Sequence, residues 1–363
     1  MHKNNDLSVV VSSLQGDDHS RVVSREGVVK SIGRRKLLIA GAALPMAAVM
    51  TKRAYASSFS IKFADGMNPN HPVNLRVVQA AKAIEKETDG AIRMRIFPNA
   101  QLGSDPNILT QARSGGVDFV CMGSDVLTTL VPSMGILNLG FAFANYDQVW
   151  KAMDGKLGAY LAAETAKVGL TQVGRSWDNG FRQITTTPHP ITSPESLAGF
   201  KIRVPPAPML TSLFQALGAS PTPVDFNELY SALQTHLVDG EENALPVIAT
   251  AKLYEVQKYC SLTNHSWDAY LMLANTAKLE RLPGKYHDII VQEFNKAALE
   301  ERQDIVDLNT TLQKQLADKL TFNMTSQAPF REKLLKTSYY NDWRGKFGDQ
   351  AWSLLEDVVG KIG

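Results

Sequence analysis

Two short stretches near the start of the predicted fold alternate apolar and polar residues, and a helical pattern separates them. Residues 59–63 and 92–96 have an apolar side chain at every second position, which predicts half-buried strands. Between them, apolar residues recur every three or four positions from Leu75 to Ile84, and Asp89-Gly90 ends the pattern. This order predicts a strand–helix–strand unit.

Further along the chain, strands and longer helices continue to alternate. Asp105-Pro106 is typical of a helix start, because a capping side chain precedes a proline at the first helical position, and Gly115-Gly116 ends that helix. The other predicted elements are strands at 117–122 and 200–204 and helices at 209–217, 228–237 and 285–320. Such alternation favours an α/β fold with largely parallel sheets. The last helix exceeds the usual length, and we expect it to pass between two domains.

Length and charge narrow the class of protein. The chain has 363 residues, enough for two ordinary domains, and its 44% hydrophobic and 20% charged residues are proportions of a globular protein. Residues 1–56 carry nine Lys or Arg against four Asp or Glu, whereas the remainder carries 29 against 32. A nearly neutral body without long basic runs lacks the surface that nucleic-acid binding requires. We therefore expect no nucleic-acid partner.

The cysteines give no sign of a metal site. Cys121 and Cys260 have no second Cys or paired His at metal-ligand spacing nearby, so neither a structural metal nor a cofactor is expected. Each lies in an apolar run, which favours buried free thiols over a disulfide.

An apolar stretch ahead of the predicted fold indicates export from the cytoplasm. Arg34-Arg35 precedes this stretch, at residues 37–50, which is shorter than the roughly 20 residues of a membrane-spanning helix. The arginine pair resembles a twin-arginine export signal, and Ala54-Tyr55-Ala56 resembles its cleavage site. The mature chain is then expected to begin at Ser57 and not to span the membrane. The alternative is an uncleaved anchor or a chance arginine pair.

The common catalytic motifs of hydrolases, metallopeptidases, redox enzymes and nucleotide-binding proteins are absent from the sequence. One alternative is nevertheless an exported enzyme that acts on an organic acid, with His265 or Asp178 as a general base. No set of nucleophile, base and orienting residue supports that alternative.

The most informative part of the sequence is a series of linked motifs between residues 98 and 265. They are Pro98-Asn-Ala-Gln-Leu-Gly103, Trp177-Asp-Asn-Gly-Phe-Arg-Gln-Ile-Thr185, Gly199-Phe-Lys-Ile-Arg-Val-Pro205, Gly218-Ala-Ser-Pro-Thr-Pro223, Tyr230-Ser-Ala-Leu-Gln-Thr235, Val238-Asp-Gly-Glu-Glu-Asn243 and Tyr254-Glu-Val-Gln-Lys258. Together they resemble the solute-binding proteins of tripartite ATP-independent periplasmic (TRAP) transporters. The resemblance covers essentially all of the mature chain.

The resemblance implies a two-domain periplasmic-binding-protein clamshell that closes on a carboxylate. The family's signature arginine falls on Arg203, whose planar guanidinium suits bidentate pairing with a carboxylate. Arg182 matches a second arginine that many members direct into the cleft, and Asn243 matches an amide that contacts the acid. The sequence departs from the family pattern at Glu241 and Ala244, where Gln and Pro are common, but Asn243 between them is retained.

Several neighbouring residues are weaker candidates for the ligand site. If the family pattern holds, Trp177, Asp178 and Asn179 are near the cleft, where they either contact the ligand or serve in hinge packing and turns. Contact with the ligand would favour a hydroxylated or an aromatic acid over a plain dicarboxylate. The remaining candidates, at predicted strand ends, are Asp65, His71, Trp267 and Asp268.

Together these observations predict a periplasmic receptor, not an enzyme, that delivers a small organic acid to the membrane subunits of a TRAP transporter. Residues 57–179 with about 268–307 are expected to form domain I, and 180–267 with about 308–363 domain II. A sensory receptor for the same ligand is the remaining alternative, because it would use the same clamshell.

Overall fold

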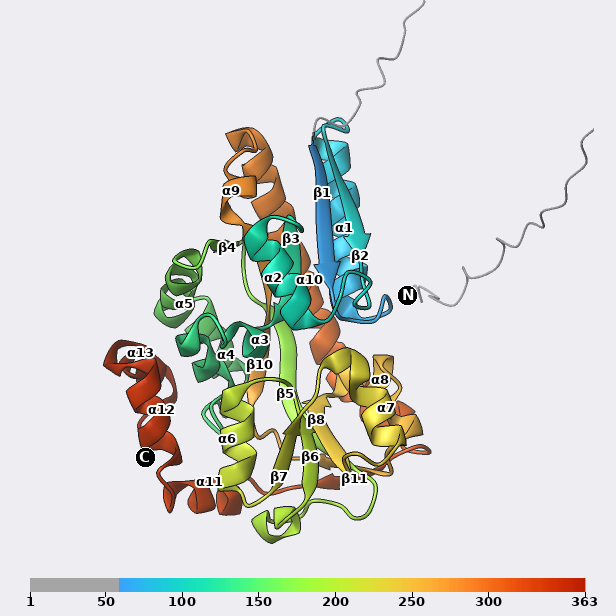
Figure 1. Ribbon diagram of the computed structural model, residues 1–363, viewed down its shortest axis with the longest axis vertical. Coiled ribbons are helices and arrows are strands. Elements are labelled where there is room, and N and C mark those ends of the chain that lie inside the picture. The colour runs from blue at the N-terminus through green and yellow to red at the C-terminus, as the bar shows by residue number, and fades with distance from the viewer. Residues whose placement is uncertain (1–58, 363) are drawn as a thin grey trace, which may run out of the picture. The chain divides into compact units, whose positions relative to one another are not determined.

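The computed structural model describes residues 59–362, so the predicted export signal lies outside the described residues. The strands are β1 (Phe59–Asp65), β2 (Ile92–Phe97), β3 (Phe119–Gly123), β4 (Leu170–Gln172), β5 (Trp177–Thr186), β6 (Lys201–Val204), β7 (Ser220–Pro223), β8 (Gly240–Ala244), β9 (Tyr259–Leu262), β10 (Trp267–Asn275) and β11 (Thr321–Met324). The strands alternate with helices through much of the chain, as an α/β fold requires (Figure 1).

The helices are of very unequal length. They are α1 (Pro72–Glu87), α2 (Asp105–Ser114), α3 (Ser124–Leu127), α4 (Tyr146–Met153), α5 (Lys156–Ala166), α6 (Pro208–Ala216), α7 (Leu229–Gln234), α8 (Leu245–Thr250), α9 (Thr276–Leu279), α10 (Gly284–Gln315), α11 (Ala328–Leu335), α12 (Tyr339–Phe347) and α13 (Asp349–Val359). Within residues 59–362, no helix is both long and apolar enough to cross a membrane.

Along its main path, the sheet consists of two parallel groups joined by two antiparallel strands, while β4 pairs with β10, and β9 pairs with β5 and β11. One group has the order β2-β1-β3 and the other β8-β6-β7, and β10 and β5 lie between them. Strand β10 runs antiparallel to β3 and β5, and β5 runs antiparallel to β8. The predicted parallel pairing therefore holds within each group, whereas the two joining strands differ from it.

Strand β5 belongs to both halves of the sheet. Residues 177–181 pair with β10, whereas residues 182–186 pair with β8 and, in part, with β9. Ten residues are enough for this double role, because each residue advances a strand by about 3.3 Å. The two halves are thus connected by continuous backbone.

Most predicted elements are present, with shifted ends. The helix predicted at 228–237 is shorter, because a 3₁₀ turn at Phe226–Glu228 precedes α7 and His236 adopts the left-handed conformation beyond it, with φ +56°. The helix predicted at 285–320 is α10, which ends at Gln315, where the N–H of the capping residue Leu316 binds the carbonyl of Leu312.

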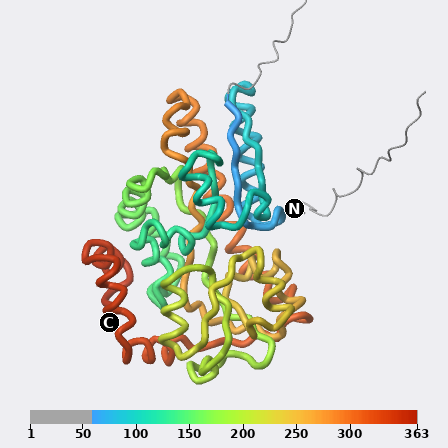
Figure 2. Tube along the Cα trace, in the orientation of Figure 1, coloured from blue at the N-terminus to red at the C-terminus, as the bar shows by residue number. Residues whose placement is uncertain are grey.

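Helix α10 packs along α1 and is also tied to the start of β5 (Figure 2). Arg76 of α1 donates from Nε to Asp304 at 2.6 Å and from Nη1 to Glu300 at 2.8 Å. Near the middle of α10, Arg302 donates from Nε to the carbonyl of Ser176 at 3.0 Å, and Glu301 accepts a hydrogen bond from the N–H of Asp178 at 2.9 Å. These bonds hold β5 in place beside the site described below.

Both cysteines are buried free thiols, as the sequence predicts. Cys121 packs with the aromatic core around β1 and α10, and Cys260 packs with the aliphatic core around α7 and α8. Burial raises the thiol pKa of each above its ordinary value.

Candidate functional site

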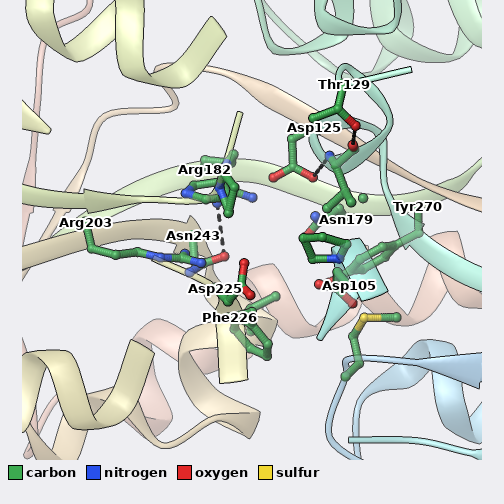
Figure 3. A pocket seen from close by; sticks show the side chains of 17 residues that line it. Asp105, Asp125, Thr129, Asn179, Arg182, Arg203, Asp225, Phe226, Asn243 and Tyr270 are labelled. Carbon is green, nitrogen blue, oxygen red and sulfur yellow. Dashed lines mark hydrogen bonds between the residues drawn. The ribbon is translucent and has the colours of Figure 1, made fainter. Parts of the chain in front are cut away.

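The carboxyl ends of strands from both parallel groups border one cavity of about 220 Å³ (Figure 3). It is lined by Met67, Asp105, Pro106, Gly123, Asp125, Val126, Thr129, Asn179, Arg182, Arg203, Pro205, Pro206, Asp225, Phe226, Asn243, Val247 and Tyr270. Gly123 ends β3, and Pro205 directly follows β6. Ligands of open α/β sheets bind at such carboxyl ends, because the loops that follow converge there.

A β-bulge brings two of the predicted site residues, Asn179 and Arg182, to the same cavity. Asp178 and Gly180 of β5 face consecutive residues of β10, so Asn179 is the extra residue. Residues three apart in a regular strand point to opposite faces of the sheet. The extra residue shifts the alternation by one, so Asn179 and Arg182 can point to the same face. Gly180 adopts φ +112°, and a Cβ there would lie 3.2 Å from the Cβ of Ala244, so the bulge depends on glycine.

Arg203 is a buried cation without a carboxylate partner among residues 59–362. Its side chain is 1% exposed, and its only hydrogen bond within this range runs from Nε to the carbonyl of Val224 at 2.8 Å. Burial lowers the pKa of Arg203, and the charges of Glu242 and Glu241 offset this effect only in part. The two terminal nitrogens therefore remain available to an anion in the cavity, and their planar fork matches a carboxylate.

Arg182, by contrast, already has a carboxylate partner. It forms a buried ion pair with Glu242, and its Nη2 donates to Oε1 of that residue at 2.8 Å and to Oδ1 of Asn243 at 3.1 Å. Burial alone would raise the pKa of Glu242, but the charge of Arg182 and hydrogen bonds from His265 and Arg182 lower it to about 2. The pair is thus a neutral, rigid part of the cavity wall.

His265 belongs to the support of this ion pair. Its Nε2 lies 3.1 Å from Oε2 of Glu242, its Nδ1 lies 2.8 Å from the hydroxyl of Thr263, and its side chain is 1% exposed. Burial lowers the pKa of His265, although Glu242 partly opposes this. His265 does not line the cavity, so the alternative of a general base at this position has no geometric support.

Asn243 lines the cavity with both ends of its amide engaged. Its Nδ2 donates to Oε2 of Glu241 at 2.6 Å, while its Oδ1 accepts the hydrogen bond from Arg182. Glu241 is itself buried and also accepts a hydrogen bond from Thr185. Burial raises the pKa of Glu241 to about 7, although the bonds from Thr185 and Asn243 act in the opposite direction. The departure from the family pattern at Glu241 thus introduces a buried titratable group.

Three acidic side chains that we did not predict as site residues also line the cavity: Asp105, Asp125 and Asp225. Asp105 begins α2, and the other two closely follow the ends of β3 and β7. Burial raises the pKa of Asp105 to about 6, and burial together with the nearby Asp268 raises that of Asp125 to about 8. The signal of Asp125 and Asp225 in the sequence is an aspartate just beyond a strand end, combined with the position of binding sites at the carboxyl ends of parallel strands.

Four predicted site residues do not line the cavity: Trp177, Asp178, Trp267 and His71. Trp177 is fully buried, with its ring centroid 6.5 Å from that of Phe294. Asp178 accepts a hydrogen bond from Nε1 of Trp267 at 2.8 Å, so the indole N–H of Trp267 is satisfied beneath the surface. Trp177 therefore cannot be the stacking wall, and this argument for an aromatic acid no longer holds.

His71, Asp65 and Asp268 each contact a residue that lines the cavity, and Asp65 does so by accepting a hydrogen bond from the N–H of Met67 at 2.8 Å. His71 caps α1, and its ring packs edge-on against Tyr270 with centroids 5.6 Å apart, while burial lowers its pKa to about 3. Asp268 accepts a hydrogen bond from Nδ2 of Asn179 at 2.6 Å. In the described part of the chain, no cluster of three or more His, Cys, Asp or Glu is arranged to hold a metal ion.

Comparison with known proteins identifies the family. The family described as "Bacterial extracellular solute-binding protein, family 7" matches residues 63–341. The chain is 32% identical over 231 residues to the 2,3-diketo-L-gulonate-binding periplasmic protein YiaO of Escherichia coli, covering 62% of this chain and 70% of that protein. It is 30% identical over 282 residues to the C4-dicarboxylate-binding periplasmic protein DctP of Rhodobacter capsulatus, covering 74% and 84%.

A solved structure shows the same fold. The sugar acid binding protein DctPAm from Advenella mimigardefordensis, in complex with galactonate, superposes with a TM-score of 0.80 at 28% identity, covering 84% of this chain and 98% of that one. This likeness confirms the predicted two-domain periplasmic-binding-protein architecture, in which α10 is the long helix. The chain therefore belongs to bacterial extracellular solute-binding protein family 7, which consists of the substrate receptors of TRAP transporters and not of enzymes.

Proposed function

We propose that this protein captures a small organic acid in the periplasm, with the acid's carboxylate bound to Arg203, and delivers it to the membrane subunits of a TRAP transporter. The observation that carries this proposal is the buried Arg203 guanidinium, which lacks a carboxylate partner within residues 59–362 and borders the cavity. An unpaired buried charge is unfavourable, so a ligand that supplies the opposite charge is favoured.

Arg182 and Asn243 give the carboxylate site its shape. The ion pair with Glu242 fixes Arg182 without leaving net positive charge there, and Arg182 in turn fixes the amide of Asn243. A carboxylate on Arg203 therefore meets side chains that are already ordered before it binds. Preorganisation of this kind reduces the entropy that binding would otherwise cost.

The cavity suits a small ligand that both domains contact. Its volume of about 220 Å³ lies below the range of about 300–1,000 Å³ that is typical for drug-sized ligands. We place domain I at residues 57–179 and about 268–307, and domain II at residues 180–267 and about 308–363. With these boundaries, Asp125 and Asn179 belong to domain I and Arg203 and Asn243 to domain II, so the ligand is held from both sides.

The periplasmic location rests on two independent supports. The family is one of extracellular solute receptors, and two similar proteins, YiaO and DctP, are periplasmic. The arginine pair and short apolar stretch at the start of the chain provide the export signal that such a location requires. Fusing residues 1–56 to a reporter protein and locating the reporter in cell fractions tests this part of the proposal.

A thermal-shift screen of paired ligands tests the proposed function. Each acid, among them monocarboxylates, dicarboxylates, sugar acids and 2-oxo acids, is compared with its uncharged primary amide. At a hundredfold excess over its Kd, a bound acid should stabilise the protein by about 2.7 kcal/mol, and its amide should stabilise it far less. A screen in which no acid raises the melting temperature, or in which the amides act as strongly, would contradict the proposal.

A further inference from the structure

Glu241, at which the chain departs from the family pattern, lies directly beside the carboxylate site without lining the cavity. It is fully buried in β8, and its position in the sheet is paired with that of Arg203 on the parallel strand β6. Residues paired across neighbouring strands extend to the same face of the sheet. A buried glutamate and the arginine that we propose as the carboxylate ligand are therefore neighbours inside the protein.

Two hydrogen bonds hold the Glu241 carboxyl group in this position. Its Oε2 accepts from Nδ2 of Asn243 at 2.6 Å, and its Oε1 accepts from the hydroxyl of Thr185, which is paired with it on β5. Asn243 in turn lines the cavity, as does Arg203 (Figure 3). The carboxyl group can gain a proton without moving, because the Thr185 hydroxyl can rotate and accept from a protonated Oε1 while Oε2 still binds Asn243.

The other charged side chains of β6 and β8, and of the residue before β8, are paired or reach solvent. Glu242 points to the opposite face of β8, where it forms the ion pair with Arg182. Two positions earlier in the two chains, Lys201 is exposed and Asp239 is partly exposed. The face of β6 and β8 that carries Glu241 therefore has one buried anion and one buried cation.

The remaining neighbours of Glu241 are uncharged. Cys260 of β9 is paired with Thr185, and burial together with the charge of Glu241 raises the pKa of its thiol, so it stays neutral at neutral pH. Helices α7 and α8, whose apolar residues pack around Cys260, contain no Asp, Glu, Lys, Arg or His. The acidic and basic residues of α10 beyond residue 305 are exposed. The charge balance at this place thus depends on Glu241, Arg203 and whatever binds Arg203.

A bound carboxylate changes this balance. Before binding, the charge of Glu241 offsets part of the effect of burial on Arg203. After binding, one guanidinium faces two carboxylates, and a net negative charge in the interior is unfavourable. A proton on Glu241 removes that excess. Burial raises the pKa of Glu241 to about 7, so this proton is readily gained near neutral pH.

We propose that Glu241 is a positioning residue that takes up a proton when a carboxylate binds Arg203, so that capture of the acid is coupled to protonation of the receptor. This inference rests on the proposed function, since it takes Arg203 as the carboxylate site. The proton comes from the buffer and ends on Glu241 between Oε1 and the Thr185 hydroxyl. Affinity should be highest below about pH 7, where Glu241 is already protonated, and should fall as the pH rises above 7.

Isothermal titration calorimetry in two buffers counts the protons. Of succinate, pyruvate and gluconate, the acid that binds tightest is titrated at about pH 7.5 in phosphate and in Tris, which have different heats of ionisation. The difference in measured binding heat gives the number of protons taken up for each acid bound. Asp105 and Asp125 also line the cavity and can contribute protons, so the count is compared between the wild type and a variant of Glu241.

Glu241→Gln is the decisive variant, because it keeps the shape of the side chain and removes the titrating group. Proton uptake at about pH 7.5 should be about 0.5–0.8 proton lower than in the wild type. Between about pH 6 and pH 9, the ratio of the wild-type Kd to the variant Kd should rise by about tenfold. A merely structural role of Glu241 would change the Kd by the same factor at every pH.

The matched control is Glu280→Gln, the same exchange at an exposed glutamate that does not line the cavity. It should leave both the proton count and the pH profile of the Kd as in the wild type. Circular dichroism shows whether each variant is folded. If Glu241→Gln does not fold, the wild type decides alone, because a Kd that stays constant from about pH 6 to pH 9 would overturn the proposal.

The outcomes separate this inference from the proposed function. Equal proton uptake in the wild type and in Glu241→Gln, with the acid bound by both, would overturn the coupling and leave the carboxylate receptor in place. A wild type that binds the acid without any proton uptake would do the same. If no acid of the thermal-shift screen binds, the proposed function itself fails, and the inference fails with it.

Discussion

Replacing each cavity arginine by alanine should separate a ligand-binding residue from a structural one. Arg203 contributes one hydrogen bond, to the carbonyl of Val224, and its buried charge lacks a carboxylate partner within residues 59–362. Arg203→Ala should therefore change the free energy of unfolding of the ligand-free protein by no more than about 1 kcal/mol, the typical net value of one hydrogen bond. Arg182→Ala leaves the buried Glu242 unpaired and should cost about 3–5 kcal/mol.

In contrast to its small effect on stability, Arg203→Ala should strongly weaken ligand binding. Loss of the only uncompensated cation of the cavity removes the partner of a desolvated carboxylate, and such losses amount to about 2–5 kcal/mol. This range corresponds to a Kd increase of about 30-fold to about 5,000-fold. Arg203→Lys keeps the charge but not the planar fork, so it should also bind poorly.

Isothermal titration calorimetry with the tightest acid from the screen measures the Kd, and urea denaturation without ligand measures stability. Circular dichroism of each variant shows whether it is folded before titration. If Arg203→Ala binds the acid as tightly as the wild type, Arg203 does not hold the carboxylate. A loss of stability in Arg203→Ala as large as in Arg182→Ala would show instead that Arg203 is already paired in the free protein.

Three further predictions follow from buried groups and from the bulge. Burial raises the pKa of Asp125 to about 8 and of Glu241 to about 7, so their stabilising contribution is complete below their unfolded values near 4 and is lost as the pH rises through 7–8. Urea denaturation should thus show a lower free energy of unfolding at about pH 9 than at about pH 5, and this decrease should be smaller in Glu241→Gln. An equal decrease in the variant and the wild type would contradict this. Gly180→Ala places a side chain at φ +112° and should destabilise the protein by roughly 1–3 kcal/mol, measured in the same assay against Gly284→Ala, where a Cβ meets open space. The buried thiols should resist iodoacetamide at about pH 8 in the native protein and react in urea, and mass spectrometry showing rapid native labelling would refute their burial.

Local patterns in the sequence predicted most of the elements. Alternation of apolar residues predicted β1 and β2, and proline and glycine marked the two ends of α2. The antiparallel β5 and β10 were not predicted, because their direction depends on the order of strands in space and not on any local pattern. Helix α10 ends five residues before its predicted end, at Gln315, although apolar residues continue to Leu320. Those last apolar residues pack into the core around α7 and α8 without extending the helix.

The sequence predicted those site residues that belong to recognisable motifs, but not the isolated ones. Arg203, Arg182, Asn243 and Asn179 were predicted from the resemblance, and all four line the cavity. Aspartates are common in loops, so an isolated one such as Asp225 does not stand out in a sequence. Trp177 is the converse case, a residue that was predicted at the site but does not line it. Its polar neighbours in the sequence did not reveal that its ring packs in the core.

The bulge at Asn179 also affects which residues of a relative an alignment pairs with the cavity residues of β5. An alignment that places a gap between Trp177 and Arg182 would assign the wrong neighbour to the arginine, although the sequence identity would hardly change. A graft of the cavity residues onto a related receptor therefore has to include the extra residue and the glycine that follows it. The spacing from Trp177 to Arg182 thus decides which side chains of β5 reach the cavity.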